Sequence, residues 1–228
     1  MVQGILEVRI TGEKIVHKYD RVAPVYDLFF GYVIESKARQ RALELAGIEN
    51  GERVLEVAMG TGLNFVDLLK RNPDGWVHGV DISLRMLEKA KKRILKTGQK
   101  NYGLHLGDCG YLPFEKDTFD VLINHYLFDI LPVEEFVPIL QEFKRVLKEE
   151  GRIVLVNMTK GEKWVHQLYE ELYRLRLIPP LLAGCRGVFL QPFLEQLGFT
   201  GFKRELISKF GFPSEVIQAV RGRRDRGI

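Results

Sequence analysis

Short apolar runs alternate regularly with amphipathic runs from about Arg53 onward, and this alternation constrains the fold more than any other feature of the chain. Four of the five apolar runs are short and continuous, as is typical of strands buried on both faces of a parallel sheet. The amphipathic runs have the length that a helix crossing between parallel strands needs. The expected strands are residues 53–58, 76–82, 102–106, 119–125 and 152–157, and the expected helices between them are residues 63–71, 84–97 and 133–148. The pattern therefore predicts an α/β fold.

The rhythm changes after the fifth predicted strand. Helices are expected at residues 162–177 and 191–197, and strands at residues 202–209 and 215–221. Pro179 and Pro180 end the first of these helices, and Gly211-Phe212-Pro213 joins the two strands as a hairpin. Residues 15–46 are expected to form two helices, broken near Pro24, that cap the edge of the site. The whole pattern predicts a Rossmann-like, doubly wound, mostly parallel sheet of seven strands, closed by a C-terminal antiparallel hairpin.

The length and composition fit one domain. With 228 residues, of which 46% are hydrophobic and 28% charged, the chain can bury one sizeable core. We expect an N-terminal helical cap (1–50), a central core (51–160), and a last part (161–228) with a lid helix, a segment beside the site and the closing hairpin. No apolar run approaches the ~18 residues that span a bilayer. Cys109 and Cys185 lack the spacing of a disulfide framework or a zinc site, so we expect a cytoplasmic protein without a bound metal.

The formal net charge is +4, a mild excess for 34 basic and 30 acidic residues. The excess is concentrated near the C-terminus, in Arg221, Arg223, Arg224 and Arg226. Such a basic tail could contact anionic lipid or nucleic acid, and it could equally be a solvated terminus. No stripe of basic and aromatic residues crosses the domain, which disfavours nucleic acid as the main partner.

The loop from Glu56 to Gly62 (EVAMGTG) leaves the first predicted strand and enters a helix. The backbone there must turn tightly and approach a ligand, and Gly60 and Gly62 leave room for that approach. Asp81 ends the second strand, where its carboxylate can accept hydrogen bonds from both hydroxyls of a ribose. Phe65 stands where a dinucleotide-binding loop has its third glycine, and the carboxylate of Glu56 would repel a pyrophosphate. The loop therefore predicts a nucleoside ligand without a pyrophosphate, while a nicotinamide dinucleotide stays open as the alternative.

Four motifs in chain order resemble those of class I S-adenosylmethionine (SAM) dependent methyltransferases. They are residues 54–65 (VLEVAMGTGLNF), residues 79–83 (GVDIS), residues 107–109 (GDC) with residues 112–114 (LPF), and residues 119–121 (FDV). Residues 19–27 (YDRVAPVYD) are similar to the N-terminal signature of the UbiE-like group. The resemblance covers about residues 19–199. It implies the fold predicted above, a SAM-binding core, and methyl transfer with S-adenosylhomocysteine (SAH) as the product.

The resemblance also implies which residues hold the nucleoside part of the cofactor. Asp81 would bind the ribose, and Ile82 and Met86 would pack beside the adenine. Asp108 would accept a hydrogen bond from the adenine amino group, with the backbone of Cys109 assisting.

The glycine loop and the end of the fourth strand would hold the methionine part. Glu56 suits its ammonium group, Asn124 would lie beneath it, and Tyr19 and Tyr26 would close over it from the N-terminal helices. Ala58 stands where the family usually has its first glycine. An alanine fits there if its φ angle is negative, so we expect a slightly tighter loop.

Methyl transfer is an in-line displacement at a carbon that the sulfonium already activates, so the protein mainly positions the acceptor and excludes water. An acceptor that is an ammonium, a phenol or a carbon acid must also lose a proton. His125, Tyr126 and Asp129 follow the fourth strand toward the cleft. His125 is the first candidate for the base, with Tyr126 beside it. The alternative is a neutral His125 that only shapes the pocket.

Three kinds of acceptor stay open: a phospholipid amine head group, a lipid quinone ring and a soluble small molecule. Residues 184–187 (GCRG) and 193–199 (FLEQLGF) resemble a segment of bacterial phosphatidylethanolamine N-methyltransferases, in which Arg186, at the rim of the cleft, would grip a phosphate. Gly187 departs from that segment, where proline is usual. Residues 162–182 could form a lid or a lipid-facing surface, or ordinary core. The favoured prediction is a phospholipid head group, with peripheral contact to an anionic membrane surface.

Other function classes are disfavoured. The chain after the fourth strand lacks the prolines of amino-group DNA methylases, and no Pro-Cys nucleophile for cytosine C5 chemistry is present. A non-catalytic SAM-binding sensor would bind SAM tightly in a sealed cleft without turnover. An NAD-dependent oxidoreductase would bind NADH in preference to SAH.

Overall fold

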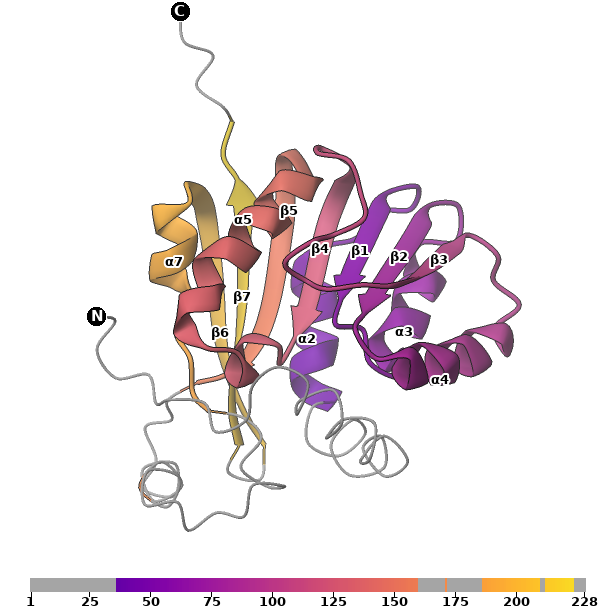
Figure 1. Ribbon diagram of the computed structural model, residues 1–228, viewed down its shortest axis with the longest axis horizontal. Helices are drawn as coiled ribbons and strands as arrows, with labels where there is room; N and C mark the ends of the chain where they lie inside the picture. Colours follow the sequence, from indigo (N-terminus) through magenta and orange to yellow (C-terminus); the bar gives the residue numbers. More distant parts are fainter. Residues whose placement is uncertain (1–35, 160–170, 172–185, 210–211, 224–228) are drawn as a thin grey trace, which may run out of the picture.

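The computed structural model describes residues 36–159, 171, 186–209 and 212–223. Its centre is a seven-stranded sheet in the order β3-β2-β1-β4-β5-β7-β6 (Figure 1). The strands are β1 (Arg53–Val57), β2 (Trp76–Asp81), β3 (Tyr102–Leu106), β4 (Phe119–His125), β5 (Leu147–Met158), β6 (Phe199–Lys209) and β7 (Phe212–Arg221). Strands β1 to β5 pair in parallel, and β7 is antiparallel to both β5 and β6. The predicted Rossmann-like sheet with its antiparallel C-terminal hairpin is confirmed.

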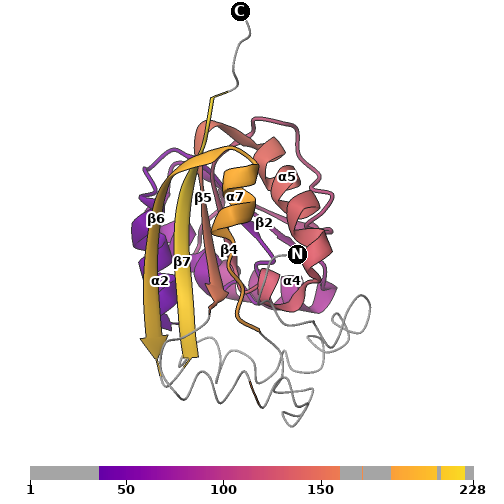
Figure 2. The same cartoon turned by 90° about the vertical axis from the view of Figure 1, so that its left-hand side faces the viewer.

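Helices cover both faces of the sheet. One face carries α2 (Ser36–Ala46), α3 (Leu63–Arg71) and α4 (Leu84–Leu95), and the other carries α5 (Phe136–Val146) and α7 (Gln191–Gln196). Figure 2 shows α2 and α5 on opposite sides of the strands. Leu122 of β4 belongs to the core beneath α5, whereas Val121 and Ile123 belong to the core beneath α2 and α3. Burial on both faces explains the continuous apolar run of this strand.

Two residues fix how α3 and α4 leave their strands. Ser83 caps α4, because its Oγ accepts a hydrogen bond of 3.2 Å from the backbone N–H of Met86. Gly62 precedes α3 with a φ angle of 76°, and a Cβ atom there would lie 3.0 Å from the Cβ of Ala90 in α4. Gly62 therefore allows both a left-handed turn and the close packing of α3 against α4.

The connection between β4 and β5 differs from the prediction. A helix is expected at 133–148 from the sequence, but α5 runs only from Phe136 to Val146, after two short 3-10 turns, η2 (Phe128–Ile130) and η3 (Val133–Glu135). Strand β5 begins at once with Leu147, which pairs with Phe119 before the register shifts to place Arg152 opposite Val121. Leu147 is fully buried in the core beneath α5. Burial of this side chain favours an early start of the strand over one more helical turn.

Some predicted segments lie outside the described residues: most of the N-terminal cap, the helix at 162–177 and the hairpin turn at 210–211. Within the described part, no helix combines the length and the apolarity that crossing a bilayer requires.

The predicted basic tail is partly paired. Arg221 is buried and forms an ion pair of 2.5 Å with Asp117. Arg223 forms an ion pair of 2.9 Å with Glu150 at the surface. Both charges have acidic partners within the chain, and the remaining arginines of the tail lie outside the described residues.

Candidate active site

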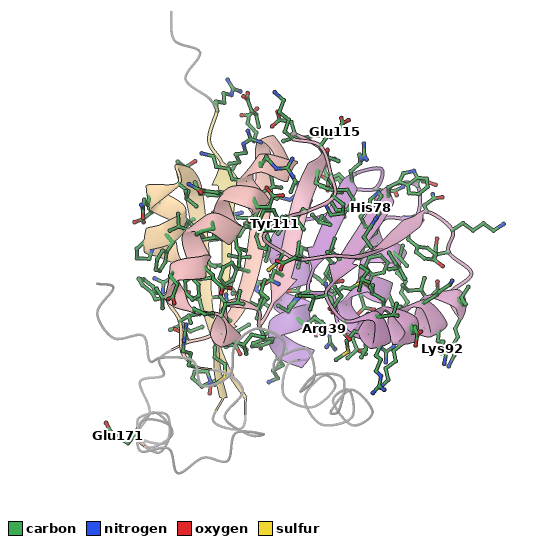
Figure 3. All side chains as sticks on the ribbon, in the orientation of Figure 1. Arg39, His78, Lys92, Tyr111, Glu115 and Glu171 are labelled. Carbon is green, nitrogen blue, oxygen red and sulfur yellow. The ribbon has the colours of Figure 1, made fainter. Side chains whose placement is uncertain are left out.

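A cavity of about 440 Å³ lies at the carboxyl ends of the parallel strands. Its wall is formed by the loop after β1, the start of α4, the segments after β3 and β4, and Arg39 of α2 (Figure 3). Ligands of open α/β sheets bind at this edge. The predicted site residues that line the cavity are Glu56, Ala58, Gly60, Asp81, Ile82, Met86, Asp108, Cys109, His125 and Tyr126.

Hydrogen bonds to the end of β2 hold the loop after β1. The N–H of Met59 donates to the carbonyl oxygen of Val80 at 3.2 Å, and the N–H of Gly60 donates to Oδ2 of Asp81 at 2.7 Å. Gly60 has a φ angle of 55°, and a Cβ atom there would meet no other atom within 4 Å. Because Gly60 lines the cavity, a side chain at this position would fill ligand space and strain the backbone.

The backbone of Ala58 corrects one prediction. Its φ angle is 53°, so the expectation of a negative φ is wrong. The chain must turn between the end of β1 and the hydrogen bond that Met59 donates to Val80, and this turn requires the left-handed conformation. An alanine in that conformation costs roughly 1–2 kcal/mol. Ala58 therefore takes a left-handed conformation that a glycine would adopt without strain.

Backbone donors fix two aspartates: Asp81, the last residue of β2, and Asp108, which follows β3. Besides the bond from Gly60, Asp81 accepts a hydrogen bond of 2.9 Å from the N–H of Ser83 through Oδ1. Oδ1 of Asp108 accepts one of 2.7 Å from the N–H of Gly110. These bonds hold both carboxylates at the cavity wall, where they suit the ribose hydroxyls and the adenine amino group as acceptors.

Two titratable groups beside Asp108 have raised pKa values. Burial, and then the neighbouring carboxylate of Asp108, raise the pKa of Cys109 to about 12. Burial and Asp108 also raise the pKa of Glu135. Cys109 is therefore a thiol at neutral pH, and its side chain lacks the thiolate character of a nucleophile.

Buried acceptor atoms next to the glycine loop suit a cationic ligand. Glu56 is 2% exposed, and its Oε1 accepts a hydrogen bond of 3.0 Å from Nδ2 of Asn64. Its Oε2 and the Oδ1 of Asn64 have no hydrogen-bond partner among the described residues. Buried acceptors are costly unless a ligand supplies donors. The ammonium of the methionine part of SAM has three N–H donors and fits this pair.

His125 lies close to the same carboxylate. Its Nδ1 is 3.7 Å from Oε1 of Glu56, and its side chain is 12% exposed. Neither ring nitrogen has a hydrogen-bond partner among the described residues. The distance is too long for a hydrogen bond, but both side chains line the same cavity. His125 is therefore suited to accept a proton from a ligand in the cavity.

Tyr126 lies next to His125 but is held by a distant strand. Its hydroxyl forms a hydrogen bond of 2.8 Å with Oγ of Ser214 in β7, and its φ angle is 54°. The bond anchors the tip of the side chain on β7, while the residue still contributes to the cavity wall. A catalytic role for Tyr126 stays a prediction.

Two predicted cofactor residues, Gly62 and Asn124, do not line the cavity. Gly62 packs on α4, as described above. Asn124 is fully buried, and its Nδ2 donates a hydrogen bond of 2.8 Å to the carbonyl oxygen of Val57, which joins the ends of β1 and β4. Tyr19 and Tyr26 lie outside the described residues.

Arg186 is also absent from the cavity wall. It is 1% exposed, its guanidinium donates a hydrogen bond to the carbonyl oxygen of Leu131, and its Cζ lies 5.9 Å from the ring centroid of Phe136. Its backbone N–H donates to the carbonyl oxygen of Asp129. Arg186 thus stabilises the segment after β4 from the side that faces away from the cavity. Its predicted position at the rim of the cleft is wrong, and phosphate binding by this residue stays a prediction.

The cavity wall also contains residues that the sequence did not single out as site residues, among them the polar or charged Arg39, Asn64 and Glu135. Asn64 could have been found from the sequence, because it lies in the motif of residues 54–65 (VLEVAMGTGLNF). In the structure it lies in the first turn of α3, and its amide donates a hydrogen bond to Glu56. Arg39 had no such signal. Helix α2 packs against β5 and β7 and brings Arg39 to the cavity from a segment well before the loop.

Known proteins share this architecture. Residues 54–151 match a family described as a methyltransferase domain. The chain is 36% identical to the demethylmenaquinone methyltransferase of Thermotoga maritima over 180 residues, which are 76% of this chain and 74% of the relative. It is 34% identical to the phosphatidylethanolamine N-methyltransferase of Cereibacter sphaeroides over 152 residues, 66% of this chain and 71% of the relative. Magnesium protoporphyrin IX methyltransferase of Synechocystis, solved with bound SAH, has the same fold, with a TM-score of 0.67 at 17% identity and coverage of 92% of this chain and 95% of that one.

The strand order, the glycine loop and these relatives lead to one assignment. The chain belongs to the class I SAM-dependent methyltransferases. Within that class it falls in the UbiE-like group, and the chain is also similar to a bacterial phosphatidylethanolamine N-methyltransferase. The protein is an enzyme, and SAM is its cofactor.

Proposed function

We propose that the acceptor is an aromatic ring of the quinone class and that the methyl group goes to a ring carbon. The observation that carries this proposal is the buried pair of Glu56 and His125, 3.7 Å apart at the cavity wall. A hydroquinone ring becomes nucleophilic at carbon when a hydroxyl group loses its proton, and His125 can accept that proton. Relatives named demethylmenaquinone methyltransferase support the same class of acceptor.

The charge of the cavity wall also favours a neutral ring over a phosphate. Four carboxylates line the cavity: Glu56, Asp81, Asp108 and Glu135. Among the described residues that line it, Arg39 is the one Lys or Arg. Carboxylates at this density repel a phosphate anion in a site of low dielectric. Apolar side chains complete the wall: Leu63, Leu127, Ile130, Leu131 and Pro132. A planar aromatic ring suits such a surface.

Bound SAM supplies a methyl group that its sulfonium activates for displacement. His125 removes the hydroxyl proton of the acceptor, and Glu56 stabilises the imidazolium that results. The ring carbon then bonds to the methyl carbon as the carbon–sulfur bond breaks. The remaining proton on that ring carbon then leaves to solvent, and the imidazolium of His125 returns its proton to the ring oxygen, which restores the aromatic hydroquinone.

An acceptor panel tests this proposal. The protein is incubated with SAM that carries a labelled methyl group and with three acceptors: a demethylated hydroquinone, phosphatidylethanolamine and a soluble phenol. We expect label on a ring carbon of the hydroquinone, located by NMR. Methylation of the phosphatidylethanolamine nitrogen without any ring methylation would overturn the proposal.

A second candidate is N-methylation of a phospholipid amine head group, which the sequence alone favoured. The similarity to the phosphatidylethanolamine N-methyltransferase of Cereibacter sphaeroides supports it. This function needs a cation near the phosphate, and Arg39 is suited to that role. If it holds, Arg39→Gln should raise the KM for phosphatidylethanolamine by about tenfold or more.

A further inference from the structure

Helix α4 and the turn after it carry the positive charge of the chain. Residues 84–100 contain seven basic residues and one acidic residue, a net charge of +6, whereas the whole chain has +4. The basic residues are Arg85, Lys89, Lys91, Lys92, Arg93, Lys96 and Lys100. The other residues together are therefore slightly acidic, and the excess charge lies on one surface.

Most of these cations face solvent. Those that are exposed are Arg85, Lys91, Lys92, Lys96 and Lys100. None of these five has an ion-pair partner in the part of the chain that the structure describes. In Figure 3 the side chain of Lys92 projects away from the body of the protein. Arg93 differs, because its guanidinium donates a hydrogen bond of 2.9 Å to Oγ1 of Thr61 and so supports the glycine loop.

Exposed leucines lie at the two ends of the same helix. Leu84 is 58% exposed and Leu95 is 62% exposed. The two leucines are eleven positions apart, about three helical turns, so both side chains lie on one side of α4, with Lys91 and the exposed Glu88 on the same side and Lys92 next to it. Ile82, just before the helix, is 52% exposed. A helical face of lysines with apolar residues is the arrangement that binds the interface of an anionic bilayer.

We propose that the outer face of α4 docks on an anionic membrane surface. The lysines contact lipid phosphates, and Leu84 and Leu95 enter the interface. The positive charge of this face complements anionic lipid. A nucleic acid fits it less well, because α4 has no aromatic side chain for stacking and its leucines gain nothing from a phosphate backbone. The inference goes beyond the proposed function and does not depend on which acceptor is methylated.

The location of α4 gives this docking a use. Ser83 and Met86 line the cavity, so the helix begins in the cavity wall. In Figure 1, α4 lies at the edge of the molecule toward which the arrowheads of β1 and β2 point. A protein bound through α4 holds its cavity beside the lipid, where a lipophilic acceptor is concentrated.

Vesicle flotation of the full chain tests the proposal. The vesicles contain phosphatidylglycerol and phosphatidylcholine, and the variant is K91Q/K92Q/K96Q. A lysine near an anionic surface contributes about 1 kcal/mol, so the variant should lose about 100-fold in partition coefficient at low salt. The matched control, K37Q/K116Q/K203Q, removes the same charge from exposed positions on other elements. It should stay within about threefold of the unmodified protein.

The apolar part has its own variant, L84Q/L95Q, which should lose the binding that persists at high salt. Calorimetry with SAH verifies that every variant is folded and separates loss of docking from loss of cofactor binding. The proposal is wrong if the unmodified protein ignores the vesicles, if both lysine variants lose binding equally, or if the α4 variant binds as well as the unmodified protein. Binding to double-stranded DNA without binding to vesicles would also overturn it.

Discussion

The two halves of the cavity wall are built in different ways. The half after β1, β2 and β3, here the loop half, is fixed by backbone N–H groups that donate to Asp81 and Asp108. The half after β4, here the β4 half, is fixed by side chains from distant segments, as when Tyr126 bonds to Ser214. The loop half can therefore be identified from short motifs, while the β4 half depends on the assembled fold. The cofactor, which is known, is expected to bind mainly at the loop half, and the acceptor, which is proposed, mainly at the β4 half.

The largest effect is expected where the loop half approaches its ligand. Gly60→Val should lower SAH affinity more than 100-fold, because the side chain would occupy cavity space at a φ angle of 55°. Calorimetry with SAH measures the loss. Gly98→Val is the matched control, since Gly98 also has a positive φ angle, 72°, and an open surrounding but lies at the end of α4. If both variants bind SAH normally, Gly60 serves only the turn.

The next effect concerns the carboxylate at the end of β2. Asp81→Ala should weaken SAH binding by roughly 1.5–3 kcal/mol, because it deletes a charged acceptor for the ribose hydroxyls. Asp120→Ala is the control: Asp120 also accepts a backbone N–H, from Arg53 at 2.9 Å, but at the amino end of β1. Isothermal titration of both variants decides the question. Equal affinity in a folded Asp81→Ala protein would remove this residue from the cofactor site.

The β4 half should respond in stability and not in cofactor binding. Arg186→Met should lower the free energy of unfolding by about 2 kcal/mol, because the carbonyl oxygen of Leu131 loses a charged donor in a buried place. Arg223→Met, which breaks the exposed pair with Glu150, should change it by about 0.5 kcal/mol or less. Urea denaturation measures both. An unchanged stability of Arg186→Met together with a raised KM for a phosphate-bearing acceptor would restore the phosphate hypothesis.

The sequence predicted the loop half because its residues stand in a fixed order along the chain. Glu56 and Asp81 lie at the carboxyl ends of β1 and β2, Gly60 and Asp108 follow β1 and β3 closely, and the topology brings these strand ends together. The β4 half could not be predicted in this way. Arg186 meets Leu131 across 55 positions, and this contact exists only once η2 and the segment before α7 are packed together.

Ala58 shows a different limit of sequence reasoning. The preference of an alanine for negative φ is a local property, and it favoured a tighter loop. The hydrogen bonds that the loop makes to β2 decide the conformation instead, at a cost of the order that a protein tolerates in a functional loop. The prediction that residues 1–50 form a helical cap and that the whole chain is one domain stays a prediction.

The smallest effect measures that cost. Ala58→Gly should raise the free energy of unfolding by about 1 kcal/mol, because glycine adopts the observed φ angle of 53° without strain. Ala42→Gly, in the middle of α2, should instead lower it by about 2 kcal/mol, because the substitution adds a flexible glycine to the helix and removes a buried methyl group. Thermal unfolding of both variants gives the comparison. A destabilised Ala58→Gly protein would mean that the alanine methyl group packs usefully in the loop.

In the proposed reaction His125 removes the acceptor proton, and the loop half of the cavity holds SAM independently of His125. The most direct measurement is the steady-state kinetics of His125→Gln with the hydroquinone acceptor, beside His105→Gln, whose ring contacts His78 outside the cavity. We expect His125→Gln to lower kcat by roughly 10²–10⁴ and to leave SAH affinity within about threefold, whereas His105→Gln should retain near-normal kcat. A His125→Gln enzyme with unchanged kcat would contradict it.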